Sequence, residues 1–289
     1  MERAVVVGTG ALARALVPAL VAQGIAVRVR SRSPQRAVEF CQALGQAGAG
    51  CAPEGDEPLL GGLLLLAVPD RAIAPTAQAA AERGDRPEAA LHLSGYHDSR
   101  VLAPLAASCA RLGFAHPLGS FPPEGPALAA GLTWCCGGSS EGAAAAATEL
   151  ALRLGGRPLQ LRETDGAKAR YHAAASLVAG GSAALLHLAE ELASGCVEDP
   201  AALRAGLTDL LASMLENARA HGPVAALTGP AARGDDAVVQ GHLDAMDPMT
   251  AAVYQALLEP MRSMAAARSA AGGAVRGAAG ATEPRRSEP

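Results

Sequence analysis

Two glycines near the start of the chain have the spacing of a phosphate-binding turn. Residues 5–13 read VVVGTGALA, a G-x-G-x-x-A motif between an apolar run typical of a β-strand and an amphipathic stretch typical of a helix. In such a motif Gly8 permits the tight turn, Gly10 leaves room for a pyrophosphate, and Ala13 keeps the helix close to the sheet. The motif predicts dinucleotide binding, with a purely structural turn as the alternative. The predicted contact residues are Gly8, Thr9, Gly10, Ala11, Leu12 and Ala13.

The end of the second predicted strand indicates which dinucleotide would bind. NAD sites usually carry an acidic residue there that accepts from the ribose 2′-hydroxyl, but this chain has none between Arg3 and Val38. The strand instead ends in RVRSRS, and guanidinium and hydroxyl groups suit a 2′-phosphate. We therefore expect NADP(H), with Arg32 as the main phosphate ligand; a solvated basic turn is the alternative. The expected set is Arg30, Ser31, Arg32 and Ser33.

Three further predicted strands end in residues that could face a ligand, because ligands of doubly wound sheets lie outside the carboxyl ends of the strands. Val68 and Pro69 are expected to line the cofactor. Ser94 could donate to the nicotinamide carboxamide or to a substrate, although serine is also an ordinary turn residue. His116, fixed by the following proline, could do acid–base work or simply hold its loop.

A helix that begins near residue 165 carries two titratable side chains on one face. Lys168 and His172 are four residues apart, and Tyr171 shares a face with Lys168. Hydride transfer to a carbonyl leaves an alkoxide, which a lysine can stabilise and a histidine can protonate. We therefore expect Lys168, His172, His116 and Ser94 to be the catalytic set and Tyr171 to contact the substrate. The alternative is a solvated helix face.

These residues need an α/β fold to bring them together. From residue 3 to about 163, β-rich runs alternate with Ala-rich amphipathic stretches, which predicts a Rossmann-type doubly wound parallel sheet with helices on both faces. We expect an all-α domain over residues 164–267, with a helix starting at the Asp199-Pro200 cap signal. Residues 268–289 are rich in Gly, Ala and Pro and are expected to be a disordered tail.

Composition excludes several classes of protein. The 289 residues are 50% hydrophobic and include 24 Lys and Arg against 28 Asp and Glu, which rules out a wholly disordered chain and gives no electrostatic reason to bind nucleic acid or an anionic membrane. No run reaches the roughly eighteen apolar residues of a membrane span. No export leader is evident, so we expect a cytoplasmic protein with a small-molecule ligand. The six cysteines form no CxxC pair, so no metal site is expected.

Seven short strings identify a family that the chain resembles. They are Gly8-x-Gly10-x-x-Ala13, Ser31-Arg32-Ser33, Val68-Pro69-Asp70, His92-Leu93-Ser94-Gly95, His116-Pro117-Leu118-x-Ser120-Phe121-Pro122, Tyr171-His172-Ala173-Ala174-Ala175 and Leu227-Thr228-Gly229-Pro230-x-x-Arg233-Gly234-Asp235. In this order they are similar to bacterial proteins that join a Rossmann-like domain to a helical domain of unknown function, within the 6-phosphogluconate-dehydrogenase-like superfamily. The resemblance covers residues 3 to about 265.

The resemblance implies an NADP-dependent oxidoreductase, usually a homodimer packed through its helical domains. Lys168 and His172 are similar in spacing to the lysine and amide of hydroxyacid dehydrogenases, and His116-Pro117 resembles a turn of prephenate dehydrogenases. Some members look like ketopantoate reductases, which suggests a 2-keto acid such as ketopantoate as substrate. Arg233 could bind its carboxylate or could pair with Asp235 or Asp236.

One departure from the family pattern bears on activity. After YHAAA the family commonly has Ser-Asn, whereas this chain reads VAGG at residues 178–181. The sequence therefore leaves three functions open: an NADPH-dependent reductase of a small carbonyl or imine, a catalytically silent NADP(H)-binding or sensing protein, and a dimeric scaffold without affinity for NADPH.

Overall fold

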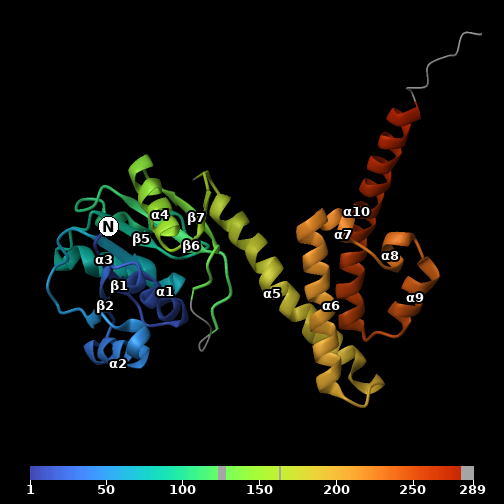
Figure 1. Cartoon of the computed structure of the whole chain (residues 1–289), viewed down its shortest axis with the longest axis horizontal. Helices are drawn as coiled ribbons and strands as arrows, with labels where there is room; N and C mark the ends of the chain where they lie inside the picture. Colours follow the sequence, from blue (N-terminus) through green and yellow to red (C-terminus); the bar gives the residue numbers. More distant parts are fainter. Residues whose placement is uncertain (123–127, 163, 281–289) are drawn as a thin grey trace, which may run out of the picture. The chain divides into compact units, whose positions relative to one another are not determined.

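The chain divides into two units, Met1–Ala179 and Gly180–Pro289 (Figure 1). The computed structural model describes residues 1–122, 128–162 and 164–280, with side chains up to residue 270. The division lies within helix α5 (Ala167–Ala193) rather than after residue 163, where the sequence predicts it. The first part of α5 belongs to the first unit because its side chains bond to the end of the sheet, as described below.

The first unit is built on one eight-stranded sheet, with the strand order β3-β2-β1-β4-β5-β6-β7-β8. Neighbouring strands pair in parallel except β6 and β7, which are antiparallel. The described residues between β6 and β7, 118–122 and 128–132, form no helix, and an antiparallel pair needs no crossover helix. The strands are β1 (Arg3–Val7), β2 (Ala26–Arg30), β3 (Cys51–Pro53), β4 (Leu63–Leu66), β5 (Ala89–His92), β6 (Leu112–Pro117), β7 (Thr133–Gly138) and β8 (Arg157–Gln160).

Helices cover both faces of this sheet, as the sequence predicts. They are α1 (Ala11–Ala22), α2 (Pro34–Leu44), α3 (Asp70–Arg83) and α4 (Glu141–Arg153), with 3-10 helices η1 (Gly45–Gly48) and η2 (Ser99–Leu105). The sequence predicts an α-helix from residue 99 to 112; the structure has the shorter η2, which contains Pro104. Proline lacks the N–H that a continuing α-helix needs.

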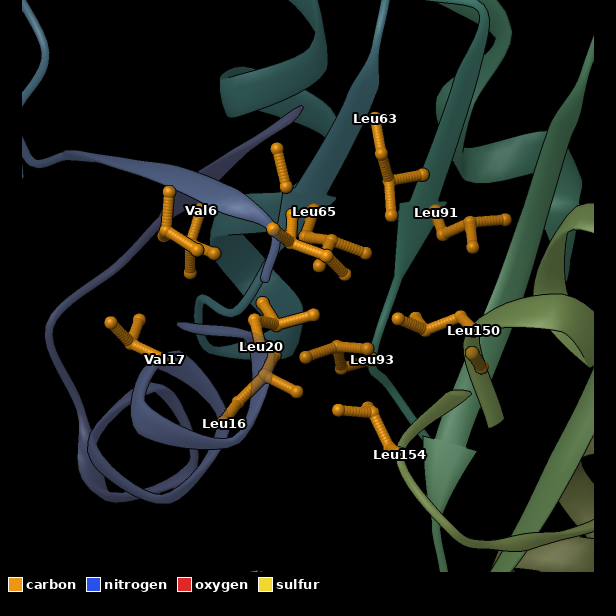
Figure 2. Packing of buried hydrophobic residues seen from close by; sticks show 14 of the residues in the cluster. Val6, Leu16, Val17, Leu20, Leu63, Leu65, Leu91, Leu93, Leu150 and Leu154 are labelled. Carbon is orange, nitrogen blue, oxygen red and sulfur yellow. The ribbon is translucent and has the colours of Figure 1, made fainter. Parts of the chain in front are cut away.

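Alternating residues of the central strands build the two cores. Val6 and Leu65 pack with Leu16 and Leu20 of α1, and Leu150 of α4 belongs to the same cluster (Figure 2). Val5 faces the other way, toward the cluster that includes residues of α3 and η2. A strand buried on both faces reads as a continuous apolar run, which is why the sequence of β4 is LLLL.

The second unit is helical. Besides the end of α5 it contains the 3-10 helix η3 (Ser194–Cys196), α6 (Pro200–His221), α7 (Pro223–Ala226), α8 (Pro230–Arg233), α9 (Asp236–Asp244) and α10 (Pro248–Gly280). Asp199 caps α6 by accepting from the N–H groups of Ala201 and Ala202 at 2.9 and 3.2 Å, as its cap signal predicts. A small core joins Ala231, Val239 and Leu258.

The last helix runs further than the sequence predicts. Helix α10 continues to Gly280, whereas the predicted helical domain ends at residue 267 and a disordered tail follows. Alanine is the strongest helix former, and no proline interrupts the chain between Pro260 and Pro284. Residues 281–289 of the predicted tail lie outside the described residues.

Within the described part of the chain, one helical segment, Ala167–Cys196, has the length and apolar composition of a membrane span. Its N-terminal turn is not free, because Lys168 and Tyr171 bond to the sheet of the first unit.

Candidate functional site

The glycine turn between β1 and α1 has the geometry that a dinucleotide-binding turn needs. Gly8 has φ +126°, and a Cβ on it would lie 2.2 Å from the carbonyl oxygen of Ala67. Only glycine fits this position. A Cβ on Gly10, in contrast, would meet no atom within 4 Å, so the space above the N-terminus of α1 is open. Ala13 is fully buried against the sheet.

A cavity of about 380 Å³ adjoins this turn, and we name it the arginine cavity. Gly8, Thr9 and Gly10 line one side of it. Its other lining residues include Ser31 and three arginines, Arg32, Arg36 and Arg71, but no aspartate or glutamate. Within the described residues none of these three guanidinium groups forms a hydrogen bond or an ion pair. The cavity therefore combines three arginines with an open glycine turn.

Sequence reasoning identified only part of this set. It predicted Ser31 and Arg32, but it gave no role to Arg36, in the first turn of α2, or to Arg71, in the first turn of α3. Arg71 directly follows the Val68-Pro69-Asp70 string, and that position at a strand end is the signal that could have found it.

Arg30 does not join the arginine cavity, which corrects its predicted role. Its side chain is buried, and Nη1 donates to Oδ2 of Asp85 at 2.7 Å. A buried guanidinium needs a carboxylate partner, and Asp85, 55 residues away, supplies it. Ser33 precedes α2 without a side-chain cap bond, and it does not line the cavity either.

A second cavity of about 310 Å³ also adjoins the glycine turn, and we name it the reaction cavity. Both cavities share Gly10, Ala67, Val68 and Pro69. The reaction cavity gathers three of the four predicted catalytic residues, Ser94, His116 and His172, from three separate segments. Its remaining lining residues are Ala11, Leu12, Asp70, Leu93, Gly95, Pro117, Gly119 and Phe121.

His116 is held in one orientation by Tyr171. The His116 Nδ1 and the Tyr171 hydroxyl oxygen are 2.9 Å apart. Burial, together with the Lys168 ammonium and His172, lowers the pKa of His116 to about 4, so the ring is neutral near pH 7. Burial also raises the pKa of the Tyr171 hydroxyl, which therefore keeps its proton.

His172 has a buried nitrogen without a partner. Its Nδ1 makes no hydrogen bond within the described residues. It packs against Gly95, where a Cβ would lie 2.4 Å from Nδ1 and 3.0 Å from His116 Nε2. Gly95 is therefore the residue that allows both rings to approach the cavity. The sequence did not single out this glycine.

Lys168 differs from its predicted role. The side chain is only 4% exposed, and Nζ donates to the carbonyl oxygen of Ser94 at 2.8 Å. The ammonium also lies 4.0 Å from the centre of the Phe114 ring. It lines neither cavity, so it does not project with His172 into the site. In this arrangement Lys168 holds the Ser94–Gly95 turn in place.

Ser94 and His92 form the rest of that turn. The Ser94 Oγ accepts from the N–H groups of Tyr96 and His97 at 3.0 and 3.1 Å. The Ser94 N–H donates to His92 Nδ1 at 3.2 Å, so His92 Nε2 carries the ring proton and donates to the Asp98 carbonyl at 3.1 Å. His92 is fully buried, and that burial, with the Lys168 charge, lowers its pKa to about 3.

The buried His92 predicts how stability depends on pH. Its ordinary pKa is 6.5, so below that pH the unfolded chain takes up a proton that the folded chain binds only near pH 3. The neutral His92 therefore contributes to the free energy of unfolding above pH 6.5. This contribution falls by about 1.4 kcal/mol per pH unit as the pH decreases toward 3. When the pH is lowered from 6.5 to 5, the free energy of unfolding of His92→Gln is expected to fall by about 2 kcal/mol less than that of the natural chain.

Urea unfolding at each pH measures this difference. The fluorescence of Trp134 reports unfolding, because this residue is the only tryptophan and is fully buried. His187→Gln is the matched control, since His187 is exposed, and it should keep the pH dependence of the natural chain. Equal slopes for His92→Gln and the natural chain would mean that His92 titrates normally.

Arg233 lies in the second unit, where its Nε donates to Asp235 Oδ2 at 2.8 Å. This is the ion pair that the sequence offered as the alternative to substrate binding. Within the described residues, no group of three or more His, Cys, Asp or Glu side chains is arranged to hold a metal ion.

Comparison with known proteins identifies the two parts of the chain. Residues 3–88 match the family described as "NADP oxidoreductase coenzyme F420-dependent", and residues 132–260 match "Domain of unknown function (DUF2520)". This pair of matches confirms the predicted resemblance. No curated protein matches the chain.

Solved structures share the fold. A candidate NADP oxidoreductase from Bacteroides fragilis superposes with a TM-score of 0.72 at 22% identity, over 91% of this chain and 98% of that one. A Thermotoga maritima protein gives 0.70 at 22% identity, over 92% and 99%. A reductive aminase from Aspergillus terreus, solved with NADPH and ethyl-5-oxohexanoate, gives 0.54 at 18% identity, over 91% and 98%. The α/β fold followed by a helical region is thereby confirmed.

Proposed function

We propose that this chain, which joins an NADP-oxidoreductase-type Rossmann domain to a DUF2520 domain, reduces a small carbonyl or imine compound with NADPH. The observation that carries the proposal is the arginine cavity beside an open glycine turn. The reductive aminase with NADPH, whose fold is similar, adds support at the level of architecture.

The residues of the two cavities fit NADPH. The N–H groups at the start of α1 can receive the pyrophosphate where Gly10 leaves open space. Arg32, Arg36 and Arg71 offer cations for a 2′-phosphate, and the lack of a carboxylate in this lining disfavours a free ribose 2′-hydroxyl. Val68 and Pro69, shared by both cavities, would then lie along the cofactor.

The reaction cavity supplies hydrogen-bond donors. When bound, NADPH supplies the hydride. In the tautomer in which the Tyr171 hydroxyl donates to His116 Nδ1, the ring proton lies on Nε2, beside Gly95. A neutral imidazole in this state can donate to the substrate oxygen or nitrogen as charge develops there. His172 is the second possible donor. Lys168 acts through the Ser94 carbonyl as a positioning residue.

The cofactor choice is tested by titrating the protein with NADPH and NADH. Arg32→Ala is expected to weaken NADPH binding about 10- to 100-fold, because one charge-assisted contact contributes about 1.5–3 kcal/mol, and to leave NADH binding unchanged. Arg28→Ala is the matched control, since Arg28 is exposed on β2, the strand that precedes Arg32, but does not line the arginine cavity. A natural chain that prefers NADH would contradict the proposal.

Activity is tested by following NADPH oxidation with ketones, cyclic imines and 2-keto acids. Turnover that is lost in His116→Ala or His172→Ala supports a reductase. Tight NADPH binding with no turnover of any compound would support the silent binding or sensing protein instead.

A further inference from the structure

A third cavity in the first unit adjoins the reaction cavity and is mostly apolar. It has a volume of about 510 Å³, and we name it the apolar cavity. Both cavities share His116, Gly119 and His172, so the two possible proton donors lie at their junction. The rest of its lining is Leu118, Ser120, Tyr171, Ala174, Ala175, Ser176, Val178 and Ala179.

No lysine or arginine lines the reaction cavity or the apolar cavity within the described residues. Lys168 is buried in the same unit, but its ammonium donates to the Ser94 carbonyl and lies over the Phe114 ring. The reaction cavity contains one carboxylate, Asp70. A substrate carboxylate here would lose its hydration without gaining a cationic partner, which is costly.

We propose that the substrate is an uncharged ketone, or an imine, with an apolar tail that occupies the apolar cavity, and not a 2-keto acid. This inference rests on the proposed function and narrows its substrate class. The reacting carbon would lie near His116 and His172, and the tail would pack on the face of α5 that carries Ala174, Ala175 and Val178. The volume of the cavity is in the range of small-molecule sites.

Three compounds separate the two substrate classes. 4-Phenyl-2-butanone and 2-oxo-4-phenylbutanoate differ only by a methyl group in place of the carboxylate, and 2-butanone lacks the phenyl tail. Calorimetric titration into protein saturated with NADP⁺ measures their affinities without requiring turnover. We expect 4-phenyl-2-butanone to bind at least about tenfold more tightly than either of the others, because burial of a phenyl group or of an unpaired charge changes affinity by that order.

Two neighbouring substitutions on α5 locate the tail. Val178 lines the apolar cavity and is 65% exposed, whereas Leu177 does not line it and is 76% exposed. Arginine is therefore tolerable at either position. Val178→Arg is expected to weaken 4-phenyl-2-butanone binding about tenfold, because the arginine side chain would occupy the space of the phenyl tail, and to leave the affinity for 2-butanone, which lacks the tail, unchanged. Leu177→Arg is the matched control and should change neither affinity.

The outcomes distinguish the two proposals. Tight binding of the ketone that Val178→Arg weakens, without NADPH oxidation, would support the substrate class and contradict the reductase. NADPH oxidation with a preference for 2-oxo-4-phenylbutanoate would support the reductase and overturn the substrate class. Failure of 4-phenyl-2-butanone to bind, or equal effects of both substitutions, would also overturn the substrate class.

Discussion

Gly10→Val is expected to weaken NADPH binding by about a hundredfold or more while leaving the fold intact. Gly10 has φ −81° and ψ −175°, an extended conformation that valine adopts readily. Its side chain would enter the open space above α1, where the pyrophosphate would bind. Loss of two charge-assisted hydrogen bonds at about 1.5 kcal/mol each corresponds to roughly that factor. Fluorescence titration with NADPH, together with urea unfolding, measures both effects.

Gly8→Ala is the contrasting variant on the same turn. At φ +126°, with a Cβ 2.2 Å from the Ala67 oxygen, alanine must displace the backbone, so this variant should lose stability as well as binding. If Gly10→Val binds NADPH as well as the natural chain does, the dinucleotide does not lie on this turn and the proposed function fails.

Asp85→Ala is expected to destabilise the first unit by about 3–5 kcal/mol, since it removes the carboxylate that is hydrogen-bonded to the buried Arg30 guanidinium and leaves only Glu54, 3.9 Å away. The Asp85 side chain is fully buried. Its Oδ2 accepts from Arg30 at 2.7 Å, and its Oδ1 accepts from the Leu59 N–H at 2.7 Å. The ion pair thus joins the end of β2 to the segments before β4 and β5. Urea unfolding followed by Trp134 fluorescence measures the loss.

Two controls test the cause of this loss. Asp56→Asn removes an exposed carboxylate from the segment before β4 and should change stability by less than about 0.5 kcal/mol. The double variant Arg30→Met, Asp85→Leu removes both charges and should recover much of the stability, because a well-packed apolar pair can replace a buried ion pair. A loss below about 1 kcal/mol in Asp85→Ala would contradict the buried pairing.

The sequence by itself determined the architecture, because local patterns carry it. Apolar runs such as residues 63–66, the glycine turn at residues 8–10 and the cap at Asp199 each specify a strand, a turn or a helix start from neighbouring residues. Their order predicts the α/β domain followed by helices, and the family strings predict the two matched families. The histidines of the reaction cavity were also predictable, since each lies at a strand end or on one helix face.

Only the tertiary structure decided which charges meet. The sequence places both Arg30 and Arg32 in the expected phosphate site, yet Arg30 is buried against Asp85 while Arg32 lines a cavity with Arg71. Lys168 shares its helix face with His172 but bonds to Ser94. These partners lie tens of residues apart in the sequence. A buried charge must be paired, and the tertiary packing of the chain determines which partner lies close enough. Local periodicity carries no information about that choice.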